Sequence, residues 1–110
     1  MASVFSKVIS GEFPARFVYK DDDVVAFLTI NPVAPGHTLV VPIKEVEHWI
    51  DLDEDTLQKL NSVSQKVGQA IYRAFPCEKI ASQIIGLEVP HVHIHLIPIN
   101  HMDDVDSAKA

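Results

Sequence analysis

The stretch His91-Val92-His93-Ile94-His95-Leu96-Ile97-Pro98 decides the fold, because histidines and apolar residues alternate along it. In a β-strand, side chains two residues apart share a face, so the three imidazoles are expected on one side. The intervening apolar side chains would pack into a core on the other side. Histidine is the side chain best suited to nucleophilic or acid–base work near neutral pH. The stretch therefore predicts a strand with a reactive face.

Length, composition and charge bound what the chain can be. Its 110 residues are expected to form one domain over residues 1–110, with 102–110 as a flexible acidic tail. The hydrophobic fraction of 47% is ordinary for a globular protein. The net charge of −6 argues against DNA or RNA as a partner, because these need basic patches. A small nucleotide needs only a local site and is compatible with this charge.

The sequence lacks the features of a secreted or membrane protein. Cys77 is the only cysteine, so neither an intramolecular disulfide nor a cysteine zinc motif can form. The first residues do not have the shape of a signal peptide. No apolar run approaches the roughly 18–20 residues of a membrane span. We therefore expect a soluble, cytoplasmic protein with no membrane partner.

The order of the expected elements favours an α+β fold. A short helix is predicted over residues 3–9, and a long one from the N-cap Asp53 to about Phe75, before Pro76. Strands are predicted over residues 16–19, 24–28, 37–41, 79–87 and 89–99. Because the strands come mostly in adjacent runs, we expect an antiparallel five-stranded sheet with one long and one short helix.

A metal ion is the first partner to consider for a row of histidines. Along a strand His91 and His95 lie roughly 13 Å apart, whereas imidazole nitrogen binds zinc at about 2.0–2.1 Å. One or two of these histidines would need a further ligand, for which His37, Glu45 and Glu88 are candidates. A metal-dependent hydrolase is therefore an alternative interpretation.

Covalent catalysis at phosphorus suits the row better. A neutral imidazole that donates from one nitrogen to a carbonyl or a second histidine presents its other nitrogen as a nucleophile. Neighbouring imidazoles can stabilise the charge that develops on a phosphoryl group. Acyl transfer would usually use serine or cysteine, and the sequence has no G-x-S-x-G motif. His37, which opens a strand directly after Gly36, is a candidate for a further histidine of this site.

These segments resemble the histidine triad (HIT) family of nucleotide hydrolases and transferases, whose signature is H-φ-H-φ-H-φ-φ with φ apolar. Residues 91–97 match the signature. Residues 4–15, 19–27 and 31–42 resemble the family's N-terminal segment, first hairpin, and proline loop with its histidine-bearing strand. The resemblance implies an enzyme that needs no cofactor, acts on a purine nucleotide or nucleotide conjugate, and commonly forms a homodimer.

The resemblance also implies roles for individual residues. His93 would be the nucleophile that attacks the α-phosphate and forms a nucleotidyl-histidine. His91, His95 and His37 would orient it and contact phosphate. The base and ribose would lie in an apolar cleft near the first strands. The implied nucleotide-binding positions are Phe5, Phe27, Thr29, Ile30 and Glu88, although Phe5 could equally be a core residue.

The chain departs from the family pattern at three places, of which one is Thr29, where many relatives have an aspartate that contacts the ribose. Ser3 and Ser6 replace the cysteine pair with which many relatives hold a structural zinc, and Glu45 replaces a histidine, so we expect no metal there. Before the triad, Leu87 replaces an amide that would contact phosphate. Glu88 places a carboxylate near the expected anion, which opposes phosphate unless the carboxylate is turned away, protonated or paired.

The sequence therefore predicts a hydrolase or nucleotidyl transferase. It would cleave a nucleoside 5′-monophosphate from an amine, phosphate or acyl leaving group through a nucleotidyl-histidine. Leu87 and Glu88 keep a second interpretation open, a nucleotide-binding regulatory module with little turnover. The metal-dependent hydrolase is the third.

Overall fold

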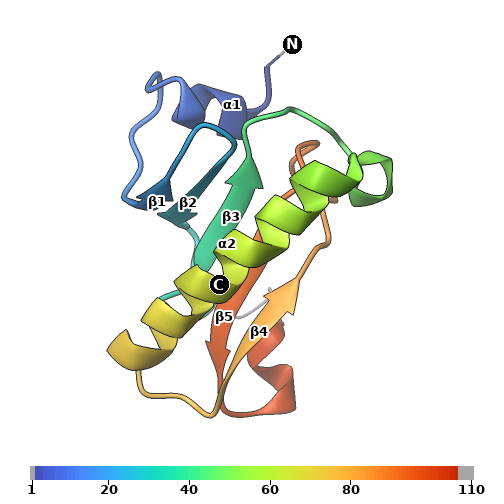
Figure 1. Ribbon diagram of the computed structural model, residues 1–110. Helices are drawn as coiled ribbons and strands as arrows, with labels where there is room; N and C mark the ends of the chain where they lie inside the picture. The colour runs from blue at the N-terminus through green and yellow to red at the C-terminus, as the bar shows by residue number, and fades with distance from the viewer. Residues whose placement is uncertain (1, 107–110) are drawn as a thin grey trace.

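Five strands form one antiparallel sheet in the computed structural model, which describes residues 2–106 (Figure 1). The strand order is β1-β2-β3-β5-β4. The strands are β1 (Phe17–Lys20), β2 (Val24–Leu28), β3 (Thr38–Pro42), β4 (Lys79–Gln83) and β5 (Ile94–Ile99). The helices are α1 (Val4–Ile9) and α2 (Glu54–Ala74), with 3-10 turns η1 (Trp49–Asp51) and η2 (Met102–Val105). The predicted α+β fold with one long and one short helix is confirmed.

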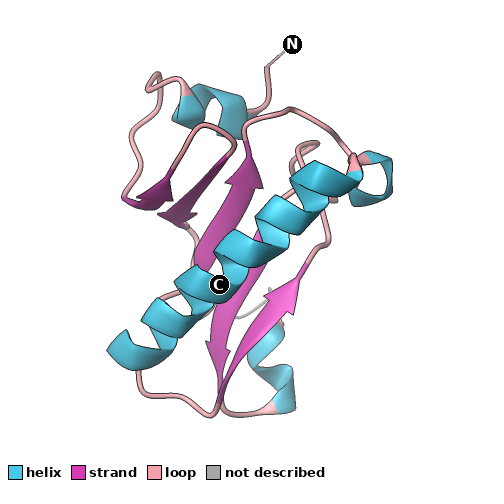
Figure 2. Cartoon of the chain, viewed as in Figure 1, coloured by secondary structure: helices cyan, strands magenta, loops and turns pink. Residues whose placement is uncertain are grey.

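A core lies on each face of the sheet, because the central strands are apolar on both sides. In β2, Val24 and Ala26 belong to the cluster that α2 covers, whereas Val25 and Phe27 pack with Phe5 of α1. Figure 2 shows α2 lying diagonally across one face of the sheet. The two-residue period of each strand thus sends successive side chains toward opposite helices.

The same alternation places the triad. Val92, Ile94 and Leu96 are buried in the cluster that α2 covers. The rings of His91 and His93 instead contact Phe5, on the α1 face. The sequence prediction of histidines on one face and apolar residues on the other therefore agrees with the structure.

The strands on either side of the triad loop are shorter than predicted. The strand expected over residues 79–87 ends at Gln83, and the one expected over residues 89–99 begins only at Ile94. Pro90 lacks an N–H for a ladder, and the His91 N–H turns back to the Val89 carbonyl at 2.8 Å. His91 and His93 therefore lie in the loop that leads into β5, and both predicted boundaries were wrong.

The C-terminal segment also differs from the prediction of a flexible tail over residues 102–110. Residues Met102–Val105 form η2, and Asp104 accepts hydrogen bonds from the backbone N–H groups of Asn100 and His101, both at 2.7 Å. The remainder of that prediction, residues 107–110, lies outside the described residues. Within residues 2–106, none of the helices has the length and apolar character needed to span a bilayer.

Candidate active site

His93 is held so that one ring nitrogen remains free. Its Nδ1 lies 2.8 Å from the carbonyl oxygen of His91, and a carbonyl only accepts, so Nδ1 carries the hydrogen. Its Nε2 has no hydrogen-bond partner among residues 2–106. Because no buried side-chain nitrogen or oxygen in this part of the chain lacks a partner, Nε2 is accessible to solvent. A neutral His93 thus exposes a lone pair on Nε2.

His37 and His95 form a hydrogen-bonded pair whose tautomers are set by the backbone. The Val33 N–H donates to Nδ1 of His37 at 3.2 Å, so the His37 hydrogen is on Nε2. This Nε2 donates to Nδ1 of His95 at 3.0 Å. In its neutral form His95 therefore keeps its hydrogen on Nε2. The ring centroids of His93 and His95 lie 4.8 Å apart. The unprotonated Nε2 of His93 and the Nε2–H of His95 therefore belong to neighbouring rings.

Gly36 is needed to place His37. It adopts a φ of +90°, a left-handed conformation that favours glycine. A Cβ atom there would also lie 2.8 Å from a ring carbon of Phe75. The glycine therefore lets the chain enter β3 close beneath the end of α2.

His91 has a different place from the other three histidines. Its side chain is 0% exposed and does not line the pocket that contains His93 and His95. Its Nε2–H donates to the Pro42 carbonyl at 2.8 Å, and its Nδ1 accepts from the Ser3 hydroxyl at 2.7 Å. Both ring nitrogens are therefore occupied and the ring is buried, so the structure places this side chain against Ser3 and Pro42 and outside the pocket. Its carbonyl, however, orients His93.

Burial keeps these histidines neutral. Desolvation lowers the pKa values of His37, His91 and His93 from the ordinary value of 6.5. The pKa of His95 is lowered to about 4, first by burial and then by the positive charge that His93 and His37 would carry. The neutral tautomers derived from the hydrogen bonds are thus the forms present at neutral pH.

A pocket of about 200 Å³ opens onto the histidines. His37, His93 and His95 contribute to it, as do Glu88 and the 90% exposed Leu87 from the triad loop. The other lining residues are Val33, Gln83, Ile85, Gly86, Ile97 and Val105.

Two contributions to this site were missed by the sequence analysis. The Val33 N–H fixes the His37 tautomer, and Gln83 is the cross-strand neighbour of His95. The proline loop was a signal for the first, and the pairing of the last two strands for the second.

Most of the predicted base and ribose residues do not line the histidine pocket. Phe5 and Phe27 are buried together with ring centroids 5.7 Å apart, and the Phe5 ring meets His93 edge-on at 4.8 Å. Thr29 uses its hydroxyl to accept from the Asn31 N–H at 3.2 Å. Ile30 is 97% exposed. Of the predicted nucleotide-binding residues, only Glu88 lines the histidine pocket.

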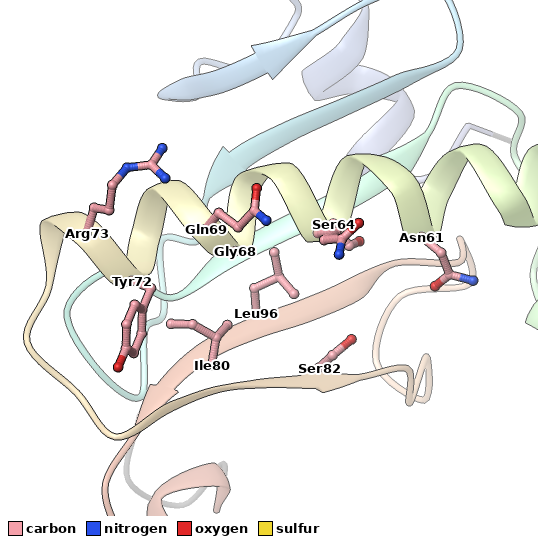
Figure 3. A pocket seen from close by; sticks show the side chains of 10 residues that line it. Asn61, Ser64, Gly68, Gln69, Tyr72, Arg73, Ile80, Ser82 and Leu96 are labelled. Carbon is pink, nitrogen blue, oxygen red and sulfur yellow. The ribbon is translucent and has the colours of Figure 1, made fainter.

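A second hollow, of about 490 Å³, lies between α2 and β4 (Figure 3). Tyr72 and Arg73 from the end of α2 and Ser82 from β4 are part of its lining. None of the triad histidines lines it.

The comparisons with known proteins agree with this geometry. The HIT domain family model matches residues 10–102. The chain belongs to the HIT family. It is 40% identical over 102 residues to an uncharacterized HIT-like protein of Methanocaldococcus jannaschii. The matched region covers 86% of this chain and 77% of that protein. The HIT domain described here also shares its antiparallel α+β fold with solved HIT structures.

Two such structures are informative. A Hit-like protein involved in cell-cycle regulation from Bartonella henselae superposes with a TM-score of 0.85 and 36% identity, covering 97% of this chain and 87% of its own. A HIT family hydrolase from Legionella pneumophila superposes with a TM-score of 0.79 and 29% identity, covering 92% and 96%. The fold of this HIT domain is therefore one that is also found in a hydrolase.

The residues at the family's zinc position do not suit that metal. Structural zinc is held by thiolate, imidazole or carboxylate ligands, whereas two of the positions are the hydroxyls of Ser3 and Ser6. Glu45, at the third of these positions, already accepts hydrogen bonds from the Ser3 N–H and the Ser6 hydroxyl. Across residues 2–106, moreover, no three His, Cys, Asp or Glu side chains are grouped so that they could hold one ion.

Proposed function

We propose that this HIT domain is a hydrolase or nucleotidyl transferase that acts through a nucleotidyl-histidine at His93. It would cleave a nucleoside 5′-monophosphate from an amine, phosphate or acyl leaving group. The observation that carries the proposal is the tautomer of His93, whose Nδ1–H donates to the His91 carbonyl and whose Nε2 is free. A neutral imidazole held in this way is a competent nucleophile.

In the first step, the Nε2 lone pair of His93 forms a bond to the α-phosphorus. The bond between phosphorus and the leaving group breaks, and its electron pair goes to the leaving atom, which takes a proton from solvent. His93 becomes positively charged, and its Nδ1–H bond to the His91 carbonyl stabilises that charge. The Nε2–H of His95 is the nearby donor that would stabilise a phosphoryl oxygen.

In the second step, water attacks the same phosphorus. The phosphorus–nitrogen bond breaks and its electron pair returns to Nε2 of His93, while the proton of the water goes to solvent. The products are the nucleoside monophosphate and the neutral histidine. A transferase would use a different acceptor in place of water.

The size of the pocket indicates that only part of the substrate enters it. Its volume of about 200 Å³ is below the roughly 300–1,000 Å³ of sites that enclose a small molecule. We infer that it receives the phosphoryl group, and that a purine base lies on the open surface beyond it. Ile30, 97% exposed in the loop between β2 and β3, is a candidate for that contact.

Glu88 and the dimer are two further parts of the proposal. The Glu88 side chain is exposed at the pocket, so it can turn away from a bound phosphate or pair with a cationic leaving group. We propose that a homodimer pairs through β4, one of the two edge strands of the sheet, because edge strands readily pair with another chain. The hollow between α2 and β4 lies beside that edge. We also propose that the protein acts in the cytoplasm.

The test is the release of AMP from an adenosine phosphoramidate, with His93→Ala as the control. We expect turnover by the natural protein and none above background by the variant, with AMP bound by both. Equal background rates in both proteins would instead support the nucleotide-binding module. Loss of turnover on treatment with a chelator, restored by a metal, would support the metal-dependent hydrolase.

A further inference from the structure

A cluster of polar side chains lies behind the histidine site, where α1 meets the loop after β3. It consists of Ser3, Ser6, Glu45 and His91 and is called the Glu45 brace below. Oε1 of Glu45 accepts from the Ser3 N–H at 2.5 Å and from the Ser6 hydroxyl at 2.6 Å. These contacts join segments that are far apart in the sequence: Ser3 and Glu45 are 42 residues apart, and Ser6 and Glu45 are 39 residues apart.

The hydrogen bonds of the brace leave one arrangement of protons. Glu45 is ionised, because the Ser3 N–H and the Ser6 hydroxyl hold its pKa down at about 2, and it can only accept. The Ser6 hydroxyl hydrogen therefore goes to Glu45. The Ser3 hydroxyl accepts from the Ser6 N–H at 3.1 Å and donates its own hydrogen to Nδ1 of His91.

His91 connects the Glu45 brace to the proposed nucleophile. With Nδ1 accepting from Ser3 and Nε2–H donating to Pro42, the His91 ring is held at both nitrogens. The carbonyl of the same residue accepts the Nδ1–H of His93 at 2.8 Å. The path from Glu45 through Ser3 and His91 to His93 is thus an unbroken series of contacts. Phe5, in the first turn of α1, packs against both histidine rings and ties the helix to the same group.

We propose that Ser3 and Glu45 are positioning residues for His93, and that the Glu45 brace holds the triad loop by hydrogen bonds where the zinc-binding pattern of relatives does not apply. The inference rests on the proposed function of His93. Neither Ser3 nor Glu45 lines the pocket that would receive the phosphoryl group, so neither lies at the reacting phosphorus. Their effect is on the orientation and tautomer of the nucleophile, which a displacement of about 1 Å is enough to impair.

The test compares Ser3→Ala and Glu45→Ala with a matched control on the same helix. Ser10→Ala is that control, because it removes a hydroxyl that bonds only to the Lys7 carbonyl, at 3.1 Å. We expect kcat for the phosphoramidate to fall about ten- to a hundredfold in both brace variants, with KM within about twofold. Ser3→Thr keeps a hydroxyl and should recover most of kcat. The kcat of the double variant Ser3→Ala/Glu45→Ala should be no lower than that of the single variant with the lower kcat, because both changes interrupt the same path.

Imidazole ¹⁵N spectra separate this inference from the proposed function. In the natural protein, His93 should show hydrogen on Nδ1 only, and in Ser3→Ala and Glu45→Ala a mixture of tautomers. That change supports the brace even if the natural protein proves inactive, a result that would sink the proposed function alone. An unchanged His93 spectrum in both folded brace variants, or a loss of kcat equal to that of Ser10→Ala, would overturn the inference. If a brace variant does not fold, Glu45→Gln provides the comparison with a smaller change, because it removes the negative charge that the Ser3 N–H and the Ser6 hydroxyl contact.

Discussion

Replacing His95 with asparagine should make the protein less sensitive to acid. Burial, followed by the proximity of His93 and His37, lowers the pKa of His95 from 6.5 to about 4. A histidine whose pKa is lowered in the folded state takes up its proton more readily when the chain unfolds. The stability that depends on neutral His95 is therefore fully present above pH 6.5, and it is lost as the pH falls toward 4.

The size of the effect follows from the shift. At about 1.4 kcal/mol per pKa unit, the difference between the pKa of 6.5 in the unfolded chain and about 4 in the folded protein corresponds to about 3 kcal/mol of unfolding free energy. Between about pH 7.5 and about pH 5, His95 alone should account for a loss of about 2 kcal/mol. Asparagine does not titrate, and its side-chain oxygen can still accept from Nε2–H of His37.

Urea unfolding of the natural protein and of His95→Asn at about pH 7.5, 6 and 5 measures the difference. We expect the free energy of unfolding of the natural protein to fall by about 2 kcal/mol more than that of the variant over this range. The urea dependence should be the same in both, which shows that they expose similar surface on unfolding. Equal losses in the two proteins would refute the claim that burial keeps His95 neutral.

Three other results are expected. Gly36→Ala should lower the unfolding free energy by about 2 kcal/mol in a thermal melt, because φ is +90° and the new Cβ would meet the Phe75 ring; an unchanged melt would contradict the described loop. On the acid side, kcat/KM should rise with pH and be level by neutral pH, because burial lowers the pKa of His93 and protonation removes the nucleophile; a midpoint above 6.5 would contradict this. Ser82→Lys should shift the protein toward monomer in light scattering, since Ser82 is exposed on β4 beside the hollow; an unchanged mass would argue against pairing through that edge.

Local patterns were sufficient to predict most of the fold. The long helix begins at the N-cap Asp53 as its sequence indicates. The alternation in the triad correctly assigned Val92 to the core and His93 to the other face, although the strand itself begins only at Ile94. The prediction held because the pattern reports which way side chains point, and this does not require a strand partner. Val92 instead donates its N–H to the Val46 carbonyl, at 2.8 Å.

The arrangement of the site depends on contacts that no local pattern encodes. Ser3 and His91 are 88 residues apart, and their hydrogen bond forms only when α1 has packed beside the triad loop. The burial that makes His91 inaccessible to phosphate follows from the same packing. The path of the triad loop, which sets Glu88 at the pocket, depends on tertiary contacts in the same way.

Intact-mass analysis of a rapidly quenched reaction with an adenosine phosphoramidate tests the central claim most directly. We predict a protein adduct of one adenylyl group that maps to the peptide containing His93 and is absent from His93→Ala. Release of AMP at the full rate with no adduct on His93 at any quench time would contradict attack by this histidine on phosphorus.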